Sequence, residues 1–121
     1  MQIMFVCTGN QCRSVMAEYY LRAELGRRGL SGTAPGANLE VRSAGTLHYP
    51  THPADPLTVD VLKADGIDAT AHASTPLTAD MSRAADLILC FEQEQVSDLL
   101  EQNPAAVRKT FLFDDLSLIH I

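Results

Sequence analysis

The residues most able to do chemistry lie in one loop that begins at Cys7 and ends at Arg13. Five residues separate the two, Gly9 and Asn10 among them, and the loop directly follows the apolar run 2–6. A loop that joins a strand to a helix directs its backbone N–H groups and the helix N-terminus at one point, which suits an anion. The guanidinium could hold two oxygens of a tetrahedral anion. The same donors would keep the cysteine as a thiolate, an activated nucleophile toward a bound phosphoryl group.

Two polar side chains are expected to support this loop. Ser14 follows the arginine, where it can cap the next helix and can also donate a hydrogen bond to the cysteine sulfur. Asn10 is suited to a strained turn conformation. The pattern C-x5-R is weak by itself, but C-x-G-N-x-C-R-S at a strand-to-helix turn is much more specific.

The elements that must position the loop alternate between strands and helices. Short apolar runs predict strands at 2–6, 39–43, 86–91 and 110–113. Apolar residues at helical spacing predict helices from Ser14 to Gly26, from Asp55-Pro56 to Gly66, from Thr78 to Arg83, and over 93–102. An extended piece is expected around 67–72. The alternation predicts an α/β fold, with helices on both faces of a doubly wound, parallel, four-stranded sheet, in a single domain of residues 1–121.

Composition restricts the partners and the compartment. The net charge of −6 argues against a nucleic-acid or membrane-surface binder, since each needs a basic face. Three cysteines, two of them in one loop, predict a reduced, cytoplasmic protein. No G-x-G-x-x-G follows the first strand, so no dinucleotide cofactor is expected. His48 and His52 have helical metal spacing, but Pro50 interrupts any helix there, so no metal site is expected.

The chain resembles the low-molecular-weight protein tyrosine phosphatase family from about residue 3 to about residue 112. The segment FVCTGNQCRS is similar to the family's phosphate-binding loop. VRSAGT, ADPLTVDVLKADGID, AHAST and ADLILCF resemble later family segments in the same order. Several ordered segments make the resemblance far more specific than the loop alone.

The resemblance implies hydrolysis of phosphotyrosine in a protein, or of a small aryl phosphate, through a cysteinyl-phosphate and without metal or cofactor. It implies that the catalytic residues are Cys7, Arg13 and Ser14. It implies that the phosphate-binding residues are Thr8, Gly9, Asn10, Gln11 and Cys12, with Tyr49 on the pocket rim, and that the supporting hydrogen-bond network is Asn10, Ser14, Ser43 and His72. Cys12 would also be able to form a reversible disulfide with Cys7.

The sequence departs from the family at the general acid. The family uses an aspartate of an Asp-Pro pair near the C-terminus, whereas Asp55-Pro56 matches a helix start. Asp114 and Asp115 follow the last predicted strand and fall too early to match the acid. We expect the chain to lack the acid loop and the last helix of the family, which would leave apolar surface exposed on one face of the sheet.

Other interpretations remain open on the residues alone. Arsenate reductase uses a similar loop but needs further cysteines, and only Cys90, in a buried strand, lies outside the loop. An oxyanion-binding fragment with impaired catalysis is the non-enzymatic alternative. Structural roles are the plainer alternatives for four of the residues: a structural cysteine at Cys12, strand-end capping at Ser43, a core histidine at His72 and a surface aromatic at Tyr49. Cys90 itself is expected to be a core residue.

Overall fold

The fold is a four-stranded parallel sheet covered by helices, as expected from the sequence. The computed structural model describes residues 1–29 and 39–113, and Asp114 and Asp115 therefore lie outside the described residues. The strand order is β2-β1-β3-β4 and every pairing is parallel. The strands are β1 (Gln2–Cys7), β2 (Glu40–Gly45), β3 (Leu87–Cys90) and β4 (Thr110–Leu112).

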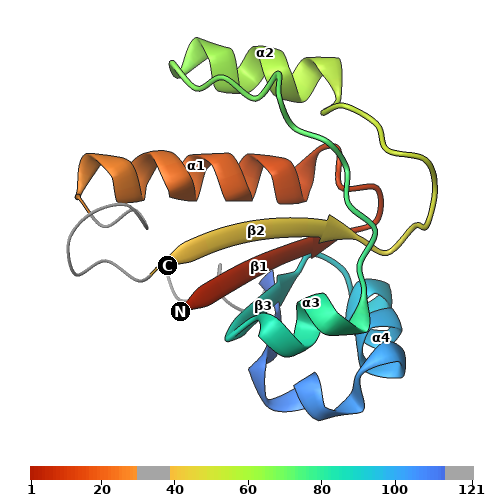
Figure 1. The fold of residues 1–121 in the computed structure, drawn as a ribbon. Helices are drawn as coiled ribbons and strands as arrows, with labels where there is room; N and C mark the ends of the chain where they lie inside the picture. Colours follow the sequence, from red (N-terminus) through yellow and green to blue (C-terminus); the bar gives the residue numbers. More distant parts are fainter. Residues whose placement is uncertain (30–38, 114–121) are drawn as a thin grey trace.

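Helices cover both faces of this sheet. Helix α1 (Arg13–Arg27) and helix α2 (Pro56–Ala64) lie on one side, and α3 (Ala79–Ala84) and α4 (Gln93–Gln102) lie on the other (Figure 1). The 3-10 turn η1 (Pro104–Lys109) leads from α4 into β4. Parallel sheets need this double cover because their strands are apolar on both faces.

Local capping determines where two of the helices begin. The Asp55 carboxylate accepts a hydrogen bond from the Leu57 N–H at 3.1 Å, and Pro56 occupies the first turn of α2. Thr78 Oγ1 accepts from the Met81 N–H at 3.2 Å at the start of α3. Both caps were predicted from the sequence and are confirmed.

The expectation that Ser14 caps the first helix is wrong. Helix α1 begins one residue earlier, its N-cap is Cys12, and no side chain caps it. Ser14 is instead fully buried in the first turn, because its hydroxyl is bonded inside the Cys7–Arg13 loop. Residues 67–72 form no strand; isolated bridges lie just beyond them, at Ala73 and Pro76.

Strand β1 is buried from both sides because its side chains alternate between two clusters. Met4 packs with Ile88 and Leu99 beneath α3 and α4. Phe5 packs with Leu89 and residues of α1 on the opposite face. The strand is therefore held rigidly, and so is the point at which it ends.

The sheet register brings three strand ends to one edge. Cys7, the last residue of β1, pairs with Gly45 at the end of β2, and Val6 pairs with Cys90 at the end of β3. Ligands of open parallel sheets bind at this edge. Within residues 1–29 and 39–113, no helix is both long enough and apolar enough to cross a membrane.

Candidate active site

The Cys7 sulfur lies at the base of the loop and receives two hydrogen bonds. The Asn10 backbone N–H donates to Sγ at 3.2 Å, and Ser14 Oγ lies 2.9 Å from Sγ. Ser14 Oγ already accepts a hydrogen bond from Asn10 Nδ2 at 2.8 Å, so its own hydrogen is free to point at the sulfur. Only 3% of Cys7 is exposed. Two donors aimed at a buried sulfur stabilise negative charge on it.

Asn10 holds the loop in its shape from the inside. It is fully buried and has a φ of 53°, in the left-handed region that asparagine tolerates better than most residues. Its Nδ2 donates to Ser14 and, at 2.9 Å, to Ser43 Oγ, while its Oδ1 accepts from the Thr75 N–H at 2.9 Å. His72 Nε2 donates to its carbonyl oxygen at 2.9 Å, which requires the proton on Nε2. The structure thus brings Asn10, Ser14, Ser43 and His72 together, as expected.

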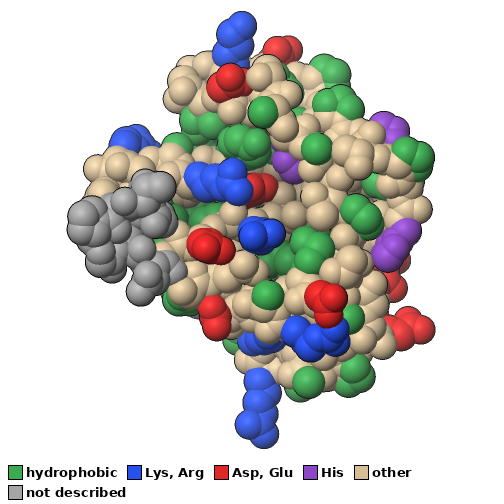
Figure 2. Space-filling model, in the orientation of Figure 1, with side chains coloured by type: hydrophobic (Ala, Val, Ile, Leu, Met, Phe, Trp, Pro, Cys, Tyr) green, Lys and Arg blue, Asp and Glu red, His purple; other side chains and the backbone are tan. Residues whose placement is uncertain are grey.

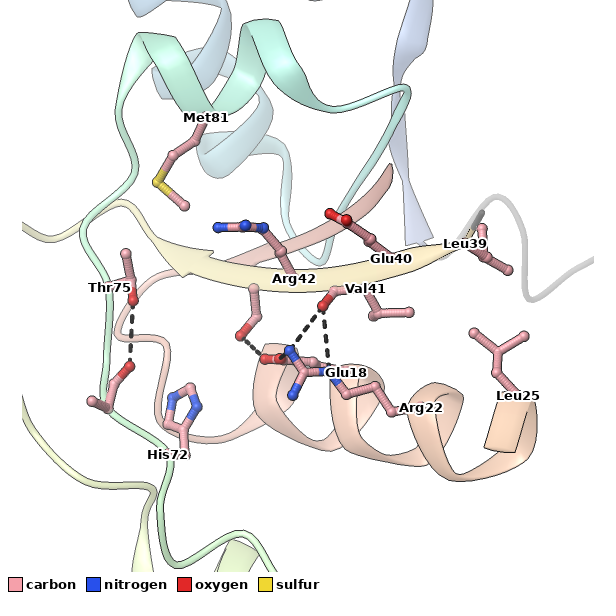
Figure 3. Close-up of a pocket in the computed structure, with 12 residues that line it drawn as sticks. Glu18, Arg22, Leu25, Leu39, Glu40, Val41, Arg42, His72, Thr75 and Met81 are labelled. Carbon is pink, nitrogen blue, oxygen red and sulfur yellow. Dashed lines mark hydrogen bonds and ion pairs between the residues drawn. The ribbon is translucent and has the colours of Figure 1, made fainter. Parts of the chain in front are cut away.

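The network continues to a residue that sequence reasoning missed. The Ser43 hydroxyl donates to Glu18, whose side chain is 7% exposed. Arg22 pairs with the same carboxylate at 2.5 Å and donates to the Val41 carbonyl at 3.0 Å (Figure 3). Glu18, a residue of α1, is thereby linked to β2 through Ser43 and Arg22. Its carboxylate holds the Ser43 hydroxyl in place beside the loop. The one available sequence signal was the spacing of Glu18 and Arg22, four residues apart on a helix.

A groove of 520 Å³ runs beside the outer edge of β2, behind this network. Its lining includes Glu18, Arg22, Arg42, Ser43 and His72, and excludes Cys7 and Arg13. In Figure 3, Arg42 and Met81 lie on one side of β2 and Arg22 lies on the other. Acidic and basic side chains are intermingled over this face of the molecule (Figure 2).

Tyr49 lies directly against the loop. Its hydroxyl donates to the Gly9 carbonyl and accepts from Gln11 Nε2 at 2.7 Å. Its ring stacks on His52 at 4.6 Å between centroids. Both hydrogen-bonding capacities of the hydroxyl are used, so the ring is held as one wall of the site.

Gly45 permits β2 to end against the loop backbone. A Cβ at this position would lie 2.7 Å from the Thr8 carbonyl oxygen and 3.0 Å from the Asn10 nitrogen. The next residue, Thr46, donates its N–H to the Cys7 carbonyl at 3.0 Å. Any side chain at Gly45 would push the loop away from the strand.

The turn between β3 and α4 contacts the loop from the other side. Gln95 is 1% exposed, and its Nε2 donates to Thr8 Oγ1 at 3.1 Å. Its Oε1 accepts from the N–H groups of Phe91 at 2.8 Å and Glu92 at 2.9 Å. Arg13 Nη2 lies 2.5 Å from Glu92 Oε1. The Gln95–Thr8 and Arg13–Glu92 contacts were not predicted, because each joins residues far apart in the sequence.

The remaining predicted residues lie as follows. Cys90 is fully buried, and burial raises the pKa of its thiol to about 12, so the core role expected for it is confirmed. Cys12 is exposed at the start of α1. Asp55 lies beside the loop, since its N–H donates to the Gln11 carbonyl at 2.9 Å, but its carboxylate caps α2. Among the described residues, no three His, Cys, Asp or Glu side chains are grouped to hold a metal ion.

Replacing Gly45→Ala is expected to destroy the loop geometry. The added methyl group would meet backbone atoms at 2.7 and 3.0 Å, so the loop must move, and binding of inorganic phosphate should weaken at least tenfold by calorimetry. Gly26→Ala is the matched control, because nothing lies within 4 Å of its Cβ position in α1. That change should leave phosphate binding intact and raise the unfolding free energy by about 0.5–1 kcal/mol. Unchanged phosphate binding in Gly45→Ala would contradict the close approach of β2.

Replacing Glu18→Gln is expected to destabilise the protein by about 2 kcal/mol, because an amide nitrogen would face the donors of Ser43 or Arg22. Urea unfolding followed by circular dichroism measures the loss. Glu24→Gln on the same helix is the control, because its partners Arg27 and Arg28 lie on the surface. Its effect should stay within about 0.5 kcal/mol. Equal losses in the two variants would show that the Ser43–Glu18 contact contributes nothing.

Comparison with known proteins places this geometry in a family. The family model described as "Low molecular weight phosphotyrosine protein phosphatase" matches residues 2–117. The low molecular weight protein-tyrosine-phosphatase Etp of Escherichia coli K12 is 40% identical over 111 residues, which are 92% of this chain and 68% of that protein. A protein-arginine-phosphatase of Bacillus subtilis is 39% identical over 102 residues, which are 84% of this chain and 63% of that protein.

Solved structures agree with the sequence matches. A YwlE arginine phosphatase variant with a phosphorylated active-site serine superposes with a TM-score of 0.84 at 34% identity, covering 96% of this chain and 71% of that one. Vibrio vulnificus Wzb in complex with benzylphosphonate gives a TM-score of 0.77 at 32% identity, covering 93% of this chain and 72% of that one. The chain belongs to the low molecular weight phosphotyrosine protein phosphatase family.

Proposed function

We propose that this protein hydrolyses phosphotyrosine in proteins through a covalent cysteinyl-phosphate on Cys7. The observation that carries the proposal is the buried Cys7 sulfur, which lies within hydrogen-bonding distance of both the Ser14 hydroxyl and the Asn10 N–H. Such a sulfur is prepared to be a thiolate nucleophile at the centre of an anion-binding loop. The phosphorylated active-site serine of the related YwlE variant supports a covalent intermediate in this family.

In the first step, the Cys7 sulfur attacks phosphorus and an S–P bond forms. The bond from phosphorus to the tyrosine oxygen breaks, and that oxygen leaves with the electron pair and takes up a proton from water. The loop N–H groups and the Arg13 guanidinium stabilise the equatorial oxygens of the transition state. Thr8, Gly9, Gln11 and Cys12 contribute the remaining backbone of this cradle.

In the second step, water attacks phosphorus, the S–P bond breaks and inorganic phosphate is released. The sulfur leaves as a thiolate, which the Ser14 hydroxyl stabilises by donating its hydrogen. Asn10, Ser43 and His72 act by holding the loop in one shape throughout. Because the loop supplies the donors for the phosphate oxygens, the mechanism needs no metal.

Tyr49 supports an aromatic substrate. Its hydroxyl is bonded to Gly9 and Gln11, and its ring can pack against the phenyl ring of phosphotyrosine. A phosphoarginine side chain has no such ring, although one relative is named as a protein-arginine-phosphatase.

A cytoplasmic location goes with this proposal, since the nucleophile and the nearby Cys12 must stay reduced.

The alternative of an arsenate reductase is less well supported. That chemistry passes oxidation from the loop to further cysteines, and the one cysteine outside the loop is Cys90. Its thiol is fully buried and stays protonated at neutral pH, since its pKa is raised to about 12. A role as an inactive oxyanion-binding fragment would show itself as phosphate binding without turnover.

Steady-state hydrolysis of an aryl phosphate is expected to be measurable for this chain and to be abolished in Cys7→Ser. Vanadate and phosphate should inhibit competitively, and a phosphotyrosine peptide should be hydrolysed at least tenfold faster than a phosphoarginine peptide at equal concentration. Cys90→Ala is the control variant, because its thiol takes no part in the reaction. Turnover that persists in Cys7→Ser, or faster release of phosphate from phosphoarginine, would contradict the proposal.

We also propose that Asp55, in the one Asp-Pro pair of the sequence, does not protonate the leaving oxygen. Its carboxylate accepts the Leu57 N–H as the cap of α2, which favours a structural role. The slope of the logarithm of the rate against the pKa of the leaving phenol is measured across a series of substituted phenyl phosphates. Asp55→Asn should leave the slope unchanged. A shallow slope in the unsubstituted protein that becomes steep in Asp55→Asn would show that Asp55 is the general acid.

A further inference from the structure

We infer that Glu92 is a positioning residue that presents the Arg13 guanidinium to the bound anion. The inference rests on the proposed function, since it assigns Arg13 to the phosphate oxygens. Glu92 lies at the start of α4, far from the Cys7–Arg13 loop in sequence, and nothing in the residue pattern of the loop points to it.

Arg13 is held by two consecutive residues that follow β3. Its Nη2 lies 2.5 Å from Glu92 Oε1, and its guanidinium carbon lies 5.8 Å from the centre of the Phe91 ring. The two side chains of the ion pair are 45% and 50% exposed, so water screens their attraction. The ion pair therefore restrains the direction of the Arg13 side chain weakly, and it contributes little to the stability of the fold.

Glu92 is itself fixed, which makes it a useful guide for a flexible arginine. It is the N-cap of α4, and a reciprocal capping box joins its side chain to the Gln95 backbone and the Gln95 side chain to its own N–H. Gln95 is almost fully buried and also bonds Thr8 at 3.1 Å. One turn of the chain thus holds both ends of the Cys7–Arg13 loop, at Thr8 and at Arg13.

The geometry allows the arginine to contact Glu92 and an anion together. A guanidinium has five N–H donors, and the Glu92 oxygen takes one on Nη2, which leaves a pair for bidentate contact with two phosphate oxygens. A free arginine side chain must lose its rotamer freedom each time it binds an anion. An arginine that is already aligned loses less, so alignment increases both anion affinity and rate.

The opposite role for Glu92 has a different signature. A carboxylate that competed with the anion for Arg13 would weaken phosphate binding, and its removal would tighten binding. A carboxylate that only capped α4 would act on stability and leave the dependence on Arg13 untouched. These two roles can be separated from positioning by the choice of variant.

The decisive variant is Glu92→Ser, because serine keeps the N-cap of α4 and is too short to reach Arg13. Glu94→Ser is the matched control, since Glu94 is exposed two residues along. Thermal unfolding verifies that both variants are folded. The measurements are kcat and KM for an aryl phosphate, and the Kd of inorganic phosphate by calorimetry, each repeated in an Arg13→Ala background.

We expect Glu92→Ser to lower kcat and to raise the phosphate Kd, each by about three- to tenfold, with Glu94→Ser within about twofold of the parent. In the Arg13→Ala background the same change should shift the phosphate Kd by less than about twofold, because its partner is gone. Tighter phosphate binding in Glu92→Ser, or an equal loss in the Arg13→Ala background, would overturn the inference.

The two proposals fail in different ways. A parent that binds phosphate in a Glu92-dependent manner without turnover overturns the proposed function and supports the inference. If the unsubstituted protein and Glu92→Ser turn over at the same rate and bind phosphate equally well, the proposed function is supported and the inference is overturned. A parent that neither binds phosphate nor turns over overturns both.

Discussion

The site depends on one buried asparagine whose backbone is in a left-handed conformation. Asn10 is fully buried, and its side chain and carbonyl are bonded to Ser14, Ser43, His72 and Thr75, which come from three separate segments of the chain. A buried network in which each of these contacts is satisfied is rigid, because breaking any one of them leaves a polar group without a partner in a medium of low polarity. The conformation of the Cys7–Arg13 loop is thus set by its surroundings.

Charge is arranged so that the donors of the loop stay free for an anion. The buried carboxylate of Glu18 accepts from Ser43 and pairs with Arg22. The Ser14 hydroxyl accepts from Asn10, which leaves its hydrogen for the Cys7 sulfur. The Asn10 amide therefore donates along two branches, one through Ser14 to the Cys7 sulfur and one through Ser43 to Glu18.

The sheet determines where the Cys7–Arg13 loop lies, and the neighbouring segments hold the loop in one shape. Parallel pairing brings Cys7, Gly45 and Cys90 to the same edge, where β2 and the β3–α4 turn approach the loop from opposite sides. Gly45 admits the backbone of the loop at a distance that no side chain would allow. Gln95 reaches Thr8 from α4. A loop held on both sides can keep its donors aimed at one point without a ligand present.

Several features were determined by the sequence alone because their causes are local. Asp55-Pro56 and Thr78 begin their helices through contacts with residues two or three positions away, and the sequence predicted α4 from Gln93 to Gln102 as the structure has it. The alternation of strands and helices was enough to predict the parallel sheet. The residue types of Cys7, Asn10 and Arg13 were enough to predict the place and the chemistry of the loop.

Other features were decided only by the tertiary structure, because their causes lie far apart in the chain. Ser14 lies within the helix instead of capping it, since its hydroxyl is bonded to both the Cys7 sulfur and the Asn10 amide. Glu18 meets Ser43 across 25 residues, and Gln95 meets Thr8 across 87. No periodicity or cap signal records such pairs, because a hydrogen bond between distant residues exists only after the strands have paired. The sequence by itself therefore determined which residues could do the chemistry, and the packed sheet decided what holds them in place.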